Sequence, residues 1–512
     1  MQCARLPSAV ARGVSRRPDR AAAAVALPMR AACPPPGLHA RGPAATRAEG
    51  RPGGASRWAD ADPPTACEVE EDGVVCAPVD EVNTSGSQSP AVQWAATAAS
   101  LGTLYAADLS LKQLFLQQGL TFPAPLAGMF VIIAVLLGTA RASGDAAAER
   151  IVDAFRPGLD WLARWLPLFY VPSLVLVPLA IRAVPGDQLG RIGVVLVVGM
   201  VASLVATAQA AVAIRRLTKT STLATAPAKP KPAFGPAHCY AWAGAAAASL
   251  AAAAAGVPGL GALTPASAFM LSATVGGHLL GSSAPAGVRA VLHPVLTMAL
   301  TAVAGAQVLA AVAPGASFDG VLGAYLAKGA GPMGAGDLLM SFLGCVILSF
   351  GFRIFEQRAI MRRHFAEIMG GCFISALFGM VVSALAGRAV GLAPELTLAL
   401  VPRSITVALA LPIAQQLQAT QLSVTATCVV LTGLLGASCA QAILDKMGQR
   451  DPIVRGMATA GSSHGLGTAA LAAKEPEALP YCALAYAVIG IMATVLASLG
   501  PVRAFLQALC GV

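Results

Sequence analysis

Apolar runs of nearly 20 residues recur along most of this 512-residue chain, and they constrain its fold more than any other feature. A helix needs about 20 consecutive apolar residues to cross the hydrocarbon core of a bilayer. Only 12% of the residues are charged, whereas soluble domains carry about 25%. The sequence therefore predicts an all-α polytopic membrane protein and excludes an ordinary soluble domain.

The apolar runs fall into two blocks, and together they predict about 12 transmembrane helices. The first block, residues 91–216, holds four runs, and the second block, residues 238–512, holds eight. Abundant alanine and glycine suit close helix packing in lipid. The expected spans are residues 92–115, 122–140, 161–184, 191–214, 240–255, 265–280, 292–312, 338–352, 373–390, 396–415, 424–443 and 483–499.

The segments outside the two blocks are polar and differ in charge. Residues 1–58 contain ten arginines, no lysine and two acids, a composition typical of an organellar transit peptide; a disordered cytosolic tail is the alternative. Residues 59–90 contain eight acidic residues and no basic one, which predicts an acidic, disordered spacer. Residues 217–237 are rich in Lys, Pro and Thr, as expected of a linker between the two blocks.

Charge and cysteine content restrict the classes of partner. The net charge is +10, but no basic patch is interleaved with aromatic residues, so we expect no nucleic-acid partner. The eleven cysteines form no C-x-x-C pair and are interpreted as small apolar fillers. We therefore expect no metal and no cofactor, and the lipid bilayer is the predicted environment.

Arg403 lies inside the run PELTLALVPRSITVALALPI, which is otherwise apolar enough for a membrane. A charge at the bilayer centre costs about 2.5–3.5 kcal/mol on insertion scales, so a partner or substrate is expected. Pro402 favours a helix break there, and a helix start beside a guanidinium is an anion site. Ser404 and Thr406 add hydroxyl donors. The alternatives are an arginine that snorkels to the headgroups and hydroxyls that bond their own backbone.

A Gly/Ser-rich sequence, SSHGLGT, separates two apolar runs that are too short to span a membrane singly. We expect a loop in a re-entrant or broken element, with glycines that allow close backbone approach. The histidine is either a packed neutral side chain or a substrate donor and proton carrier, since imidazole titrates near neutral pH. The candidate residues are Ser462, Ser463, His464, Gly465, Gly467 and Thr468.

Two further features qualify this interpretation. Adjacent serine and histidine do not form a catalytic triad, so we expect that the protein is not an enzyme. Asp337 opens an apolar run, and we expect it either to cap a helix or to take part in proton coupling.

A weak internal repeat supports a transporter. Residues 342–357, FLGCVILSFGFRIFEQ, resemble residues 400–415, LVPRSITVALALPIAQ, at a fixed offset of 58. Each copy begins with a helix breaker, Gly344 or Pro402, and ends in glutamine. Repeats with broken helices mark the binding sites of secondary transporters, so we expect an internal inverted repeat.

Several motifs resemble a known family. PRSITVALALPI, VVLTGLLGA, GAGDLLMSFLGCVILSF and RDPIVRGMATAGSSHGLGTAALAAKEPEALPYCALAYAVIGI are similar to the LrgB-type membrane family. FPAPLAGMFV and WLPLFYVPSLVLVP, within residues 105–216, are similar to its LrgA-type, holin-like companion. The resemblance covers about 400 residues. It implies an LrgA-like half, residues 91–216, fused to an LrgB-like transport half, residues 238–512, with residues 1–58 as a chloroplast transit peptide.

The plant and algal branch of that family implies a specific function. We expect a secondary transporter in the chloroplast inner envelope that exchanges glycolate, leaving, for glycerate, entering, in photorespiration. A holin-like pore or regulator of membrane integrity is the alternative. Proton coupling and a homodimer are left open.

The hypothesis for the site joins the resemblance to the residues above. Arg403 pairs with the substrate carboxylate, to which its planar fork is matched. The nearby hydroxyls bond the 2-hydroxyl or the second carboxylate oxygen, and His464 donates a hydrogen bond or carries a proton. The LrgA-like half is expected to be a scaffold or dimer surface, because no equivalent buried charge is evident in its sequence.

Overall fold

The computed structural model describes residues 66–70, 73–77, 89–120, 122–182, 184–222, 234–259, 264–285, 288–289, 292–329 and 331–512. The chain divides into two compact units, Met1–Thr84 and Ser85–Val512. The predicted transit peptide and most of the predicted linker lie outside the described residues.

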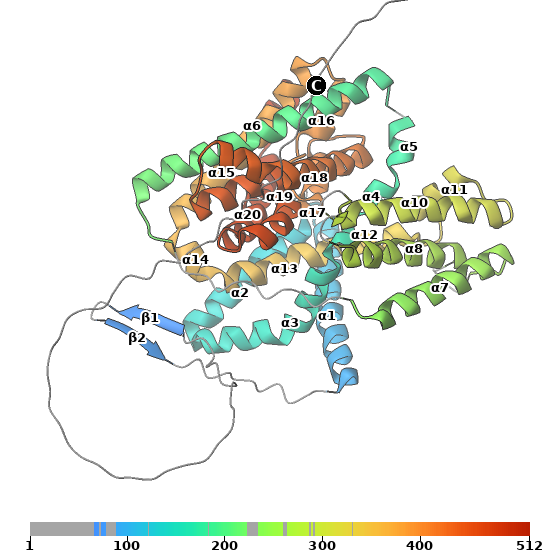
Figure 1. Ribbon diagram of the computed structural model, residues 1–512, viewed down its shortest axis with the longest axis horizontal. Coiled ribbons are helices and arrows are strands. Elements are labelled where there is room, and N and C mark those ends of the chain that lie inside the picture. The colour runs from blue at the N-terminus through green and yellow to red at the C-terminus, as the bar shows by residue number, and fades with distance from the viewer. Residues whose placement is uncertain are drawn as a thin grey trace, which may run out of the picture. The chain divides into compact units, whose positions relative to one another are not determined.

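Within the first unit, two strands form an antiparallel hairpin (Figure 1). These are β1, Ala66–Glu70, and β2, Gly73–Ala77, and their register pairs Cys67 with Cys76. An Asp-Gly dipeptide at residues 72–73 is a strong hairpin signal. The acidic spacer was expected to lack secondary structure, so these ten residues differ from that expectation.

Helices are the regular secondary structure of the described residues after 89, and the first of these helices belong to the first apolar block. Pro172 and Pro178 divide the third predicted span into three consecutive helices, because each proline removes a backbone donor, whereas Pro167 lies inside the first of them. The helices of this block are α1 Pro90–Gln117, α2 Ala124–Ser143, α3 Asp145–Tyr170, α4 Pro172–Val175, α5 Val177–Arg182 and α6 Gly186–Thr218.

The second apolar block supplies the remaining helices. They are α7 Pro236–Ala254, α8 Pro265–Ser283, α10 Pro294–Val312, α11 Phe318–Tyr325, α12 Ala335–Ser341, α13 Leu343–Glu356, α14 Arg358–Arg363, α15 Phe365–Ala389, α16 Pro394–Leu400, α17 Val407–Gln416, α18 Leu422–Lys446, α19 Pro452–Lys474, α20 Leu479–Ser498 and α21 Gly500–Cys510.

Proline and side-chain caps fix where these helices begin. Helices α1, α2, α7, α8, α10, α16, α19 and α20 carry proline in the first turn, where a backbone donor is not needed. The hydroxyl of Thr264 accepts from the backbone of Ser267 at the start of α8. The carboxylate of Asp451 accepts from the backbone of Ile453 at the start of α19.

Eight helical segments of the described residues are long and apolar enough to cross a membrane. They are α2, the run Asp145–Arg182, α6, α10, the run Ala335–Glu356, α15, α18 and α20. The other four predicted spans are also helical, as α1, α7, α8 and the pair α16–α17, but they fall short in length or hydropathy. The predicted all-α polytopic membrane fold is thus confirmed, with eight clear spans rather than about 12.

Apolar side chains on the outside of the bundle agree with a lipid environment. On α2, Phe130, Val131, Val135 and Leu137 are each more than 40% exposed. An apolar face of this kind on a 20-residue helix matches a bilayer rather than water.

The chain order of the second block supports the predicted repeat. The pair α12–α13 is interrupted at Phe342 and is followed by the six-residue helix α14 and then by the 25-residue helix α15. At an offset of 58 residues, the interrupted pair α16–α17 is followed by the 25-residue helix α18. Both copies are therefore a broken helix followed by a long one, whereas an inverted relation between them remains a prediction.

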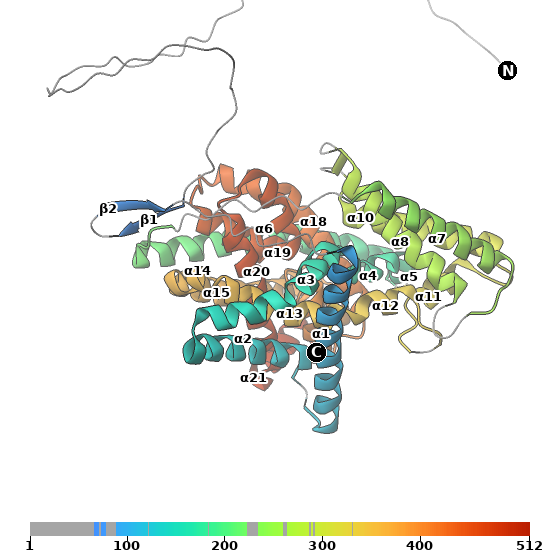
Figure 2. The same ribbon diagram turned by 90° about the horizontal axis from the view of Figure 1, so that it is seen from below.

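Helix α6 packs among helices of the second block although it ends the first. It contacts α15, α18 and α19, and Figure 1 shows it lying along that group. Figure 2 shows α7, α8, α10 and α11 together on the other side of this unit, where they pack on one another. Helix α6 is thus part of the surroundings of the two broken helices described next.

Candidate functional site

The first break separates α16 from α17 and contains Arg403. Residues 401–405 form turns in which the backbone N–H of Arg403 donates to Leu400 (3.1 Å) and that of Ile405 donates to Pro402 (3.0 Å). Helix α17 begins after Thr406, which is its N-cap residue. A break at Pro402 was expected, but Arg403 lies in the turn rather than in the first turn of the following helix.

Arg403 is fully buried, with 0% of its surface exposed. Its Nη2 donates to the hydroxyl of Ser203 on α6 over 3.2 Å, whereas Nε and Nη1 have no hydrogen-bond partner in the described part of the chain. The ion pairs among the described residues do not include it. A buried guanidinium with one neutral partner is an incomplete site, because the desolvation of a charge is normally offset by an anion.

Small residues let other helices approach this guanidinium. A Cβ at Gly199 of α6 would overlap the guanidinium of Arg403, so a larger residue there would displace the guanidinium. A Cβ at Gly379 of α15 would lie 2.9 Å from the hydroxyl oxygen of Ser404. Arg403 and Ser404 therefore lie between α6 and α15, in a pocket of small and polar side chains.

The second break lies inside α19 at His464, whose backbone has φ 43° and ψ −139°. This left-handed φ is unfavourable for a residue with a Cβ, and such strain costs on the order of 1–3 kcal/mol. The expected Gly/Ser loop is therefore wrong in detail: residues 462–468 are helical except at this one position. The expected broken element is confirmed, because two helical segments meet at His464.

The imidazole of His464 is directed at α18. Its Nε2 lies 2.9 Å from the backbone carbonyl oxygen of Val429, so Nε2–H donates there. A Cβ at Gly433 would lie 2.6 Å from Nε2, and a Cβ at Gly436 would overlap Ser463. Helix α18 thus has glycine where α19 presents its two polar side chains.

The remaining predicted site residues divide into buried and partly buried positions. Ser462 and Ser463 are fully buried, and their hydroxyl oxygens lie 3.0 Å apart. A Cβ at Gly467 would lie 2.6 Å from Thr459, whereas one at Gly465 would meet nothing closer than 3.8 Å. The close approach expected of glycine thus occurs at Gly467 and not at Gly465. Thr406 and Thr468 are partly buried.

The two breaks meet along α6 and α18. Ser203 of α6 accepts from Arg403, and one turn further Thr207 donates to Ser375 over 2.8 Å. A Cβ at Gly461 would overlap both Thr207 and Ser375. Four residues of helix rise about 6 Å, so the segment just before His464 passes within about one turn of Arg403. Two motifs that the sequence separates by some 60 residues therefore lie against neighbouring turns of α6.

Sequence reasoning missed the contribution of α6. Gly199, Ser203 and Thr207 recur every four residues, which places them on one helix face. That spacing was the available signal, but small residues are common wherever membrane helices pack. The first block also contains a buried charge, Asp108, which is 0% exposed and ion-paired with Lys112. This half therefore contains a buried charge, but an ion-paired one, and its role as a scaffold or dimer surface stays a prediction.

Asp337 has the geometry of a structural cap. Its carboxylate accepts from the backbone N–H groups of Ala327 (2.8 Å), Lys328 (3.0 Å) and Gly334 (3.1 Å). These contacts favour the capping interpretation over proton coupling, which stays a prediction.

The run GSSHG at residues 461–465 also matches the spacing G-x-S-x-G of a hydrolase nucleophile elbow. That elbow requires a sharp turn from a strand to a helix. Here the run lies within α19, and the described residues after 89 contain no strand. The match is therefore one of letters alone.

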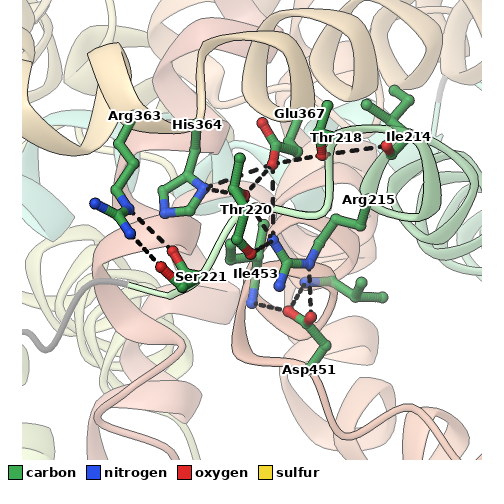
Figure 3. Close-up of polar contacts among 11 residues, drawn as sticks. Ile214, Arg215, Thr218, Thr220, Ser221, Arg363, His364, Glu367, Asp451 and Ile453 are labelled. Carbon is green, nitrogen blue, oxygen red and sulfur yellow. Dashed lines mark hydrogen bonds and ion pairs between the residues drawn. The ribbon is translucent and has the colours of Figure 1, made fainter.

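A polar network lies at the far end of α6, away from the breaks (Figure 3). Glu367 is 1% exposed and accepts from the hydroxyls of Thr218 (2.8 Å) and Thr220, while Arg215 lies 3.7 Å away. Arg215 also donates to Asp451 over 2.6 Å. The network therefore joins the end of α6 to the starts of α15 and α19.

Comparison with known proteins now bears on this arrangement. The LrgB-like family matches residues 274–501, which include both breaks. The chain is 45% identical over 413 residues to the plastidal glycolate/glycerate translocator 1, chloroplastic, of Arabidopsis thaliana, and the match covers 80% of each protein. The chain belongs to the LrgB-like family.

Bacterial relatives cover only part of this LrgB-like chain. An uncharacterised protein of Bacillus subtilis is 29% identical over 170 residues, which is 33% of this chain and 70% of the relative. An uncharacterised protein of Haemophilus influenzae is 27% identical over 157 residues, 31% of this chain and 68% of the relative. No solved structure matches the chain.

Proposed function

We propose that this protein is a secondary transporter, not an enzyme, that exchanges glycolate for glycerate across the inner envelope of the chloroplast. Glycolate leaves and glycerate enters, as photorespiration requires. The name of the Arabidopsis relative, aligned over 80% of the chain, supports the substrate pair and the organelle. The arginine-rich composition of residues 1–58 agrees with a chloroplast transit peptide.

The observation that carries the proposal is the unpaired guanidinium of Arg403. Nε and Nη1 lack partners although the side chain is fully buried. A carboxylate offers two oxygens in the geometry that a guanidinium fork accepts. Binding of a small 2-hydroxy acid would therefore complete this site, and release would restore the unfavourable empty state. This difference in free energy between the bound and the empty site favours binding of the exchange partner to the empty carrier.

The other residues are assigned by their place beside the two breaks. Ser203, Ser404 and Thr406 bond the second carboxylate oxygen or the 2-hydroxyl, and Ser462, Ser463 and Thr468 complete the polar wall from α19. Gly465 and Gly467 keep the backbone of α19 accessible. His464 donates to substrate when it leaves the carbonyl of Val429. Coupled protons on His464 or Asp337, and a homodimer, belong to this proposal as further options to be tested.

Because Arg403 is 0% exposed, the structure is closed around the site. Substrate reaches the guanidinium only if the helices around it move. The two breaks supply the flexible points, since broken helices at a midplane site are the usual moving parts of such carriers. A carrier of this type saturates and shows counterflow, whereas a pore does neither.

Counterflow tests the proposal. The full chain is reconstituted in liposomes loaded with unlabelled glycerate, and uptake of labelled glycolate is followed at several external concentrations. We expect saturable uptake that requires internal glycerate. Uptake that ignores internal substrate and rises linearly with concentration would establish a holin-like pore and remove the site assignment with it.

A further inference from the structure

A cavity that Arg403 does not line lies where the first helices meet the second block. It has a volume of about 660 Å³ and is bounded by α1, α2, α13, α17 and α21. Ligand sites usually measure about 300–1,000 Å³. Two cationic residues, Lys112 and Arg503, line this cavity and no acidic residue does. The charge of the lining therefore favours an anionic ligand.

Lys112 uses one of its three N–H donors on a buried partner and keeps the others for a ligand. Its Nζ lies 2.6 Å from Asp108, and its side chain is 43% exposed, whereas Asp108 is fully buried. The second carboxylate oxygen of Asp108, Oδ1, has no hydrogen-bond partner in the described residues. A Cβ at Gly344 would overlap this carboxylate, so Asp108 is fixed against the start of α13. Asp108 therefore holds Lys112 in place, and the exposed part of the ammonium remains available to an anion in the cavity.

Arg503 supplies a cation without a partner. Its backbone N–H donates to Leu499, but its guanidinium makes no hydrogen bond or ion pair within the described part of the chain. Gln415 of α17 lines the same cavity with an amide. A guanidinium, an ammonium and an amide around one space are the groups that bind a carboxylate and a neighbouring hydroxyl.

Helix α17 connects this cavity to the first break. It begins at Val407, directly after the turn that contains Arg403, and its residues Ala408, Leu411, Pro412 and Gln415 line the cavity. A ligand in the cavity is therefore held along the same helix that leads to Arg403. The position of the cavity is that expected of an outer binding site through which a ligand passes before it reaches the buried site at Arg403.

We propose that the cavity between Lys112 and Arg503 is a loading site for small carboxylates, separate from the site at Arg403. The incoming carboxylate pairs with Arg503 and accepts a hydrogen bond from the ammonium of Lys112, which stays paired with Asp108. The identity of the ligand as a 2-hydroxy acid rests on the proposed function. The cavity is larger than such an acid requires, so the ligand keeps water around it and binds more weakly than at Arg403.

Direct binding separates the two sites. Arg403→Gln removes the buried site, and equilibrium dialysis of the full chain in neutral detergent then measures labelled glycolate at the remaining one. We expect weak, saturable binding to the Arg403→Gln protein. Adding Arg503→Gln should lower this affinity at least tenfold. Arg141→Gln is the matched control, because Arg141 is an exposed arginine on α2 that does not line the cavity, and it should change nothing.

Lys112 is tested without leaving a buried charge behind. Lys112→Met alone would leave Asp108 buried and unpaired. The variant therefore combines Lys112→Met with Asp108→Asn. In the Arg403→Gln background, this double change should also lower glycolate affinity at least tenfold. The loading site is disproved if Arg403→Gln abolishes all binding, or if the Arg503 and Lys112 changes leave binding intact. An anionic lipid in the cavity would give the first of these results.

The outcomes distinguish this inference from the proposed function. If the wild type shows no counterflow but glycolate binding still depends on Arg503 and Lys112, the exchanger is rejected and the loading site is retained. Wild-type counterflow with binding that ignores both cations would keep the exchanger and reject the loading site.

Discussion

Arg403 and His464 each hold an unfavourable arrangement in the substrate-free protein. Arg403 is a buried cation with two unpaired nitrogens, and His464 is a non-glycine residue with a left-handed φ. Surrounding contacts must compensate for both, since neither is stable by itself. Unfavourable local conformations and unpaired charges in a well-packed interior are typical of residues that bind a ligand, rather than of residues that only stabilise the fold.

The variant His464→Gly distinguishes the role of the backbone break from that of the imidazole side chain. Glycine adopts the backbone of residue 464 without strain, which gains on the order of 1–3 kcal/mol. The lost hydrogen bond to Val429 costs about 1 kcal/mol, and the space left by the buried imidazole costs on the order of 2 kcal/mol more. The gain and the losses nearly cancel, so we expect a thermal midpoint close to that of the wild type, measured in detergent, but glycolate exchange reduced at least tenfold. Normal exchange in His464→Gly would show that the imidazole serves packing alone.

Gly199→Ala tests whether α6 shapes the site. The added Cβ would overlap the guanidinium of Arg403 and displace it, and overpacking of this kind costs about 1–3 kcal/mol. We expect at least a tenfold loss of glycolate exchange. Gly193→Ala is the control on the same helix, since a Cβ there meets nothing within 4 Å. Equal exchange rates for the two variants would exclude α6 from the site.

At the scale of elements, α6 and the two broken helices act as one group. Helix α6 contacts Arg403 near its middle and carries Arg215 at its end, where the network of Glu367 and Asp451 holds α15 and α19. The middle and the C-terminal end of α6 are therefore both attached to the second block. A movement that opens the site must shift α6 together with its partners or break the network of Figure 3.

This network makes stability depend on pH through His364, which lies between α14 and α15. Burial lowers the pKa of its imidazole, and Glu367 beside it opposes that shift in part. Arg215 of α6, Arg363 of α14 and the ring of Tyr481 of α20 also face it. The folded protein thus keeps His364 neutral at a pH where the unfolded chain, with a pKa of about 6.5, takes up a proton.

Stability linked to His364 is therefore fully present above about pH 6.5 and decreases as the pH falls below it. We expect the thermal midpoint of the wild type to fall between pH 7 and pH 5, and His364→Gln to reduce that slope. Melting curves at several pH values measure both. Parallel pH profiles for the two proteins would mean that His364 is not the responsible group.

At the scale of the whole molecule, the sequence predicts the helical membrane fold well because apolar runs report directly on the bilayer. It also predicts the break at Pro402 and the burial of Arg403, since a missing backbone donor and a charge in an apolar run have few structural solutions. It does not predict the helix over residues 462–468. Glycine and serine favour loops locally, and only packing against α18 and α6 makes them helical.

The assignment of α6 is the other part that the sequence does not reveal. Residues 91–216 resemble a separate half, and the linker after them indicates a boundary. In the structure, Gly199, Ser203 and Thr207 face the breaks of the second half. Long-range contacts of this kind depend on three-dimensional packing, which a single sequence does not specify.

The most direct test of the account is counterflow by Arg403→Gln. Wild type, Arg403→Gln and the exposed control Arg141→Gln are reconstituted at equal density in liposomes loaded with glycerate, and initial uptake of labelled glycolate is measured. The account predicts that uptake by Arg403→Gln falls to that of protein-free liposomes, while Arg141→Gln equals the wild type. Wild-type uptake by Arg403→Gln would contradict the claim that this guanidinium binds the substrate carboxylate.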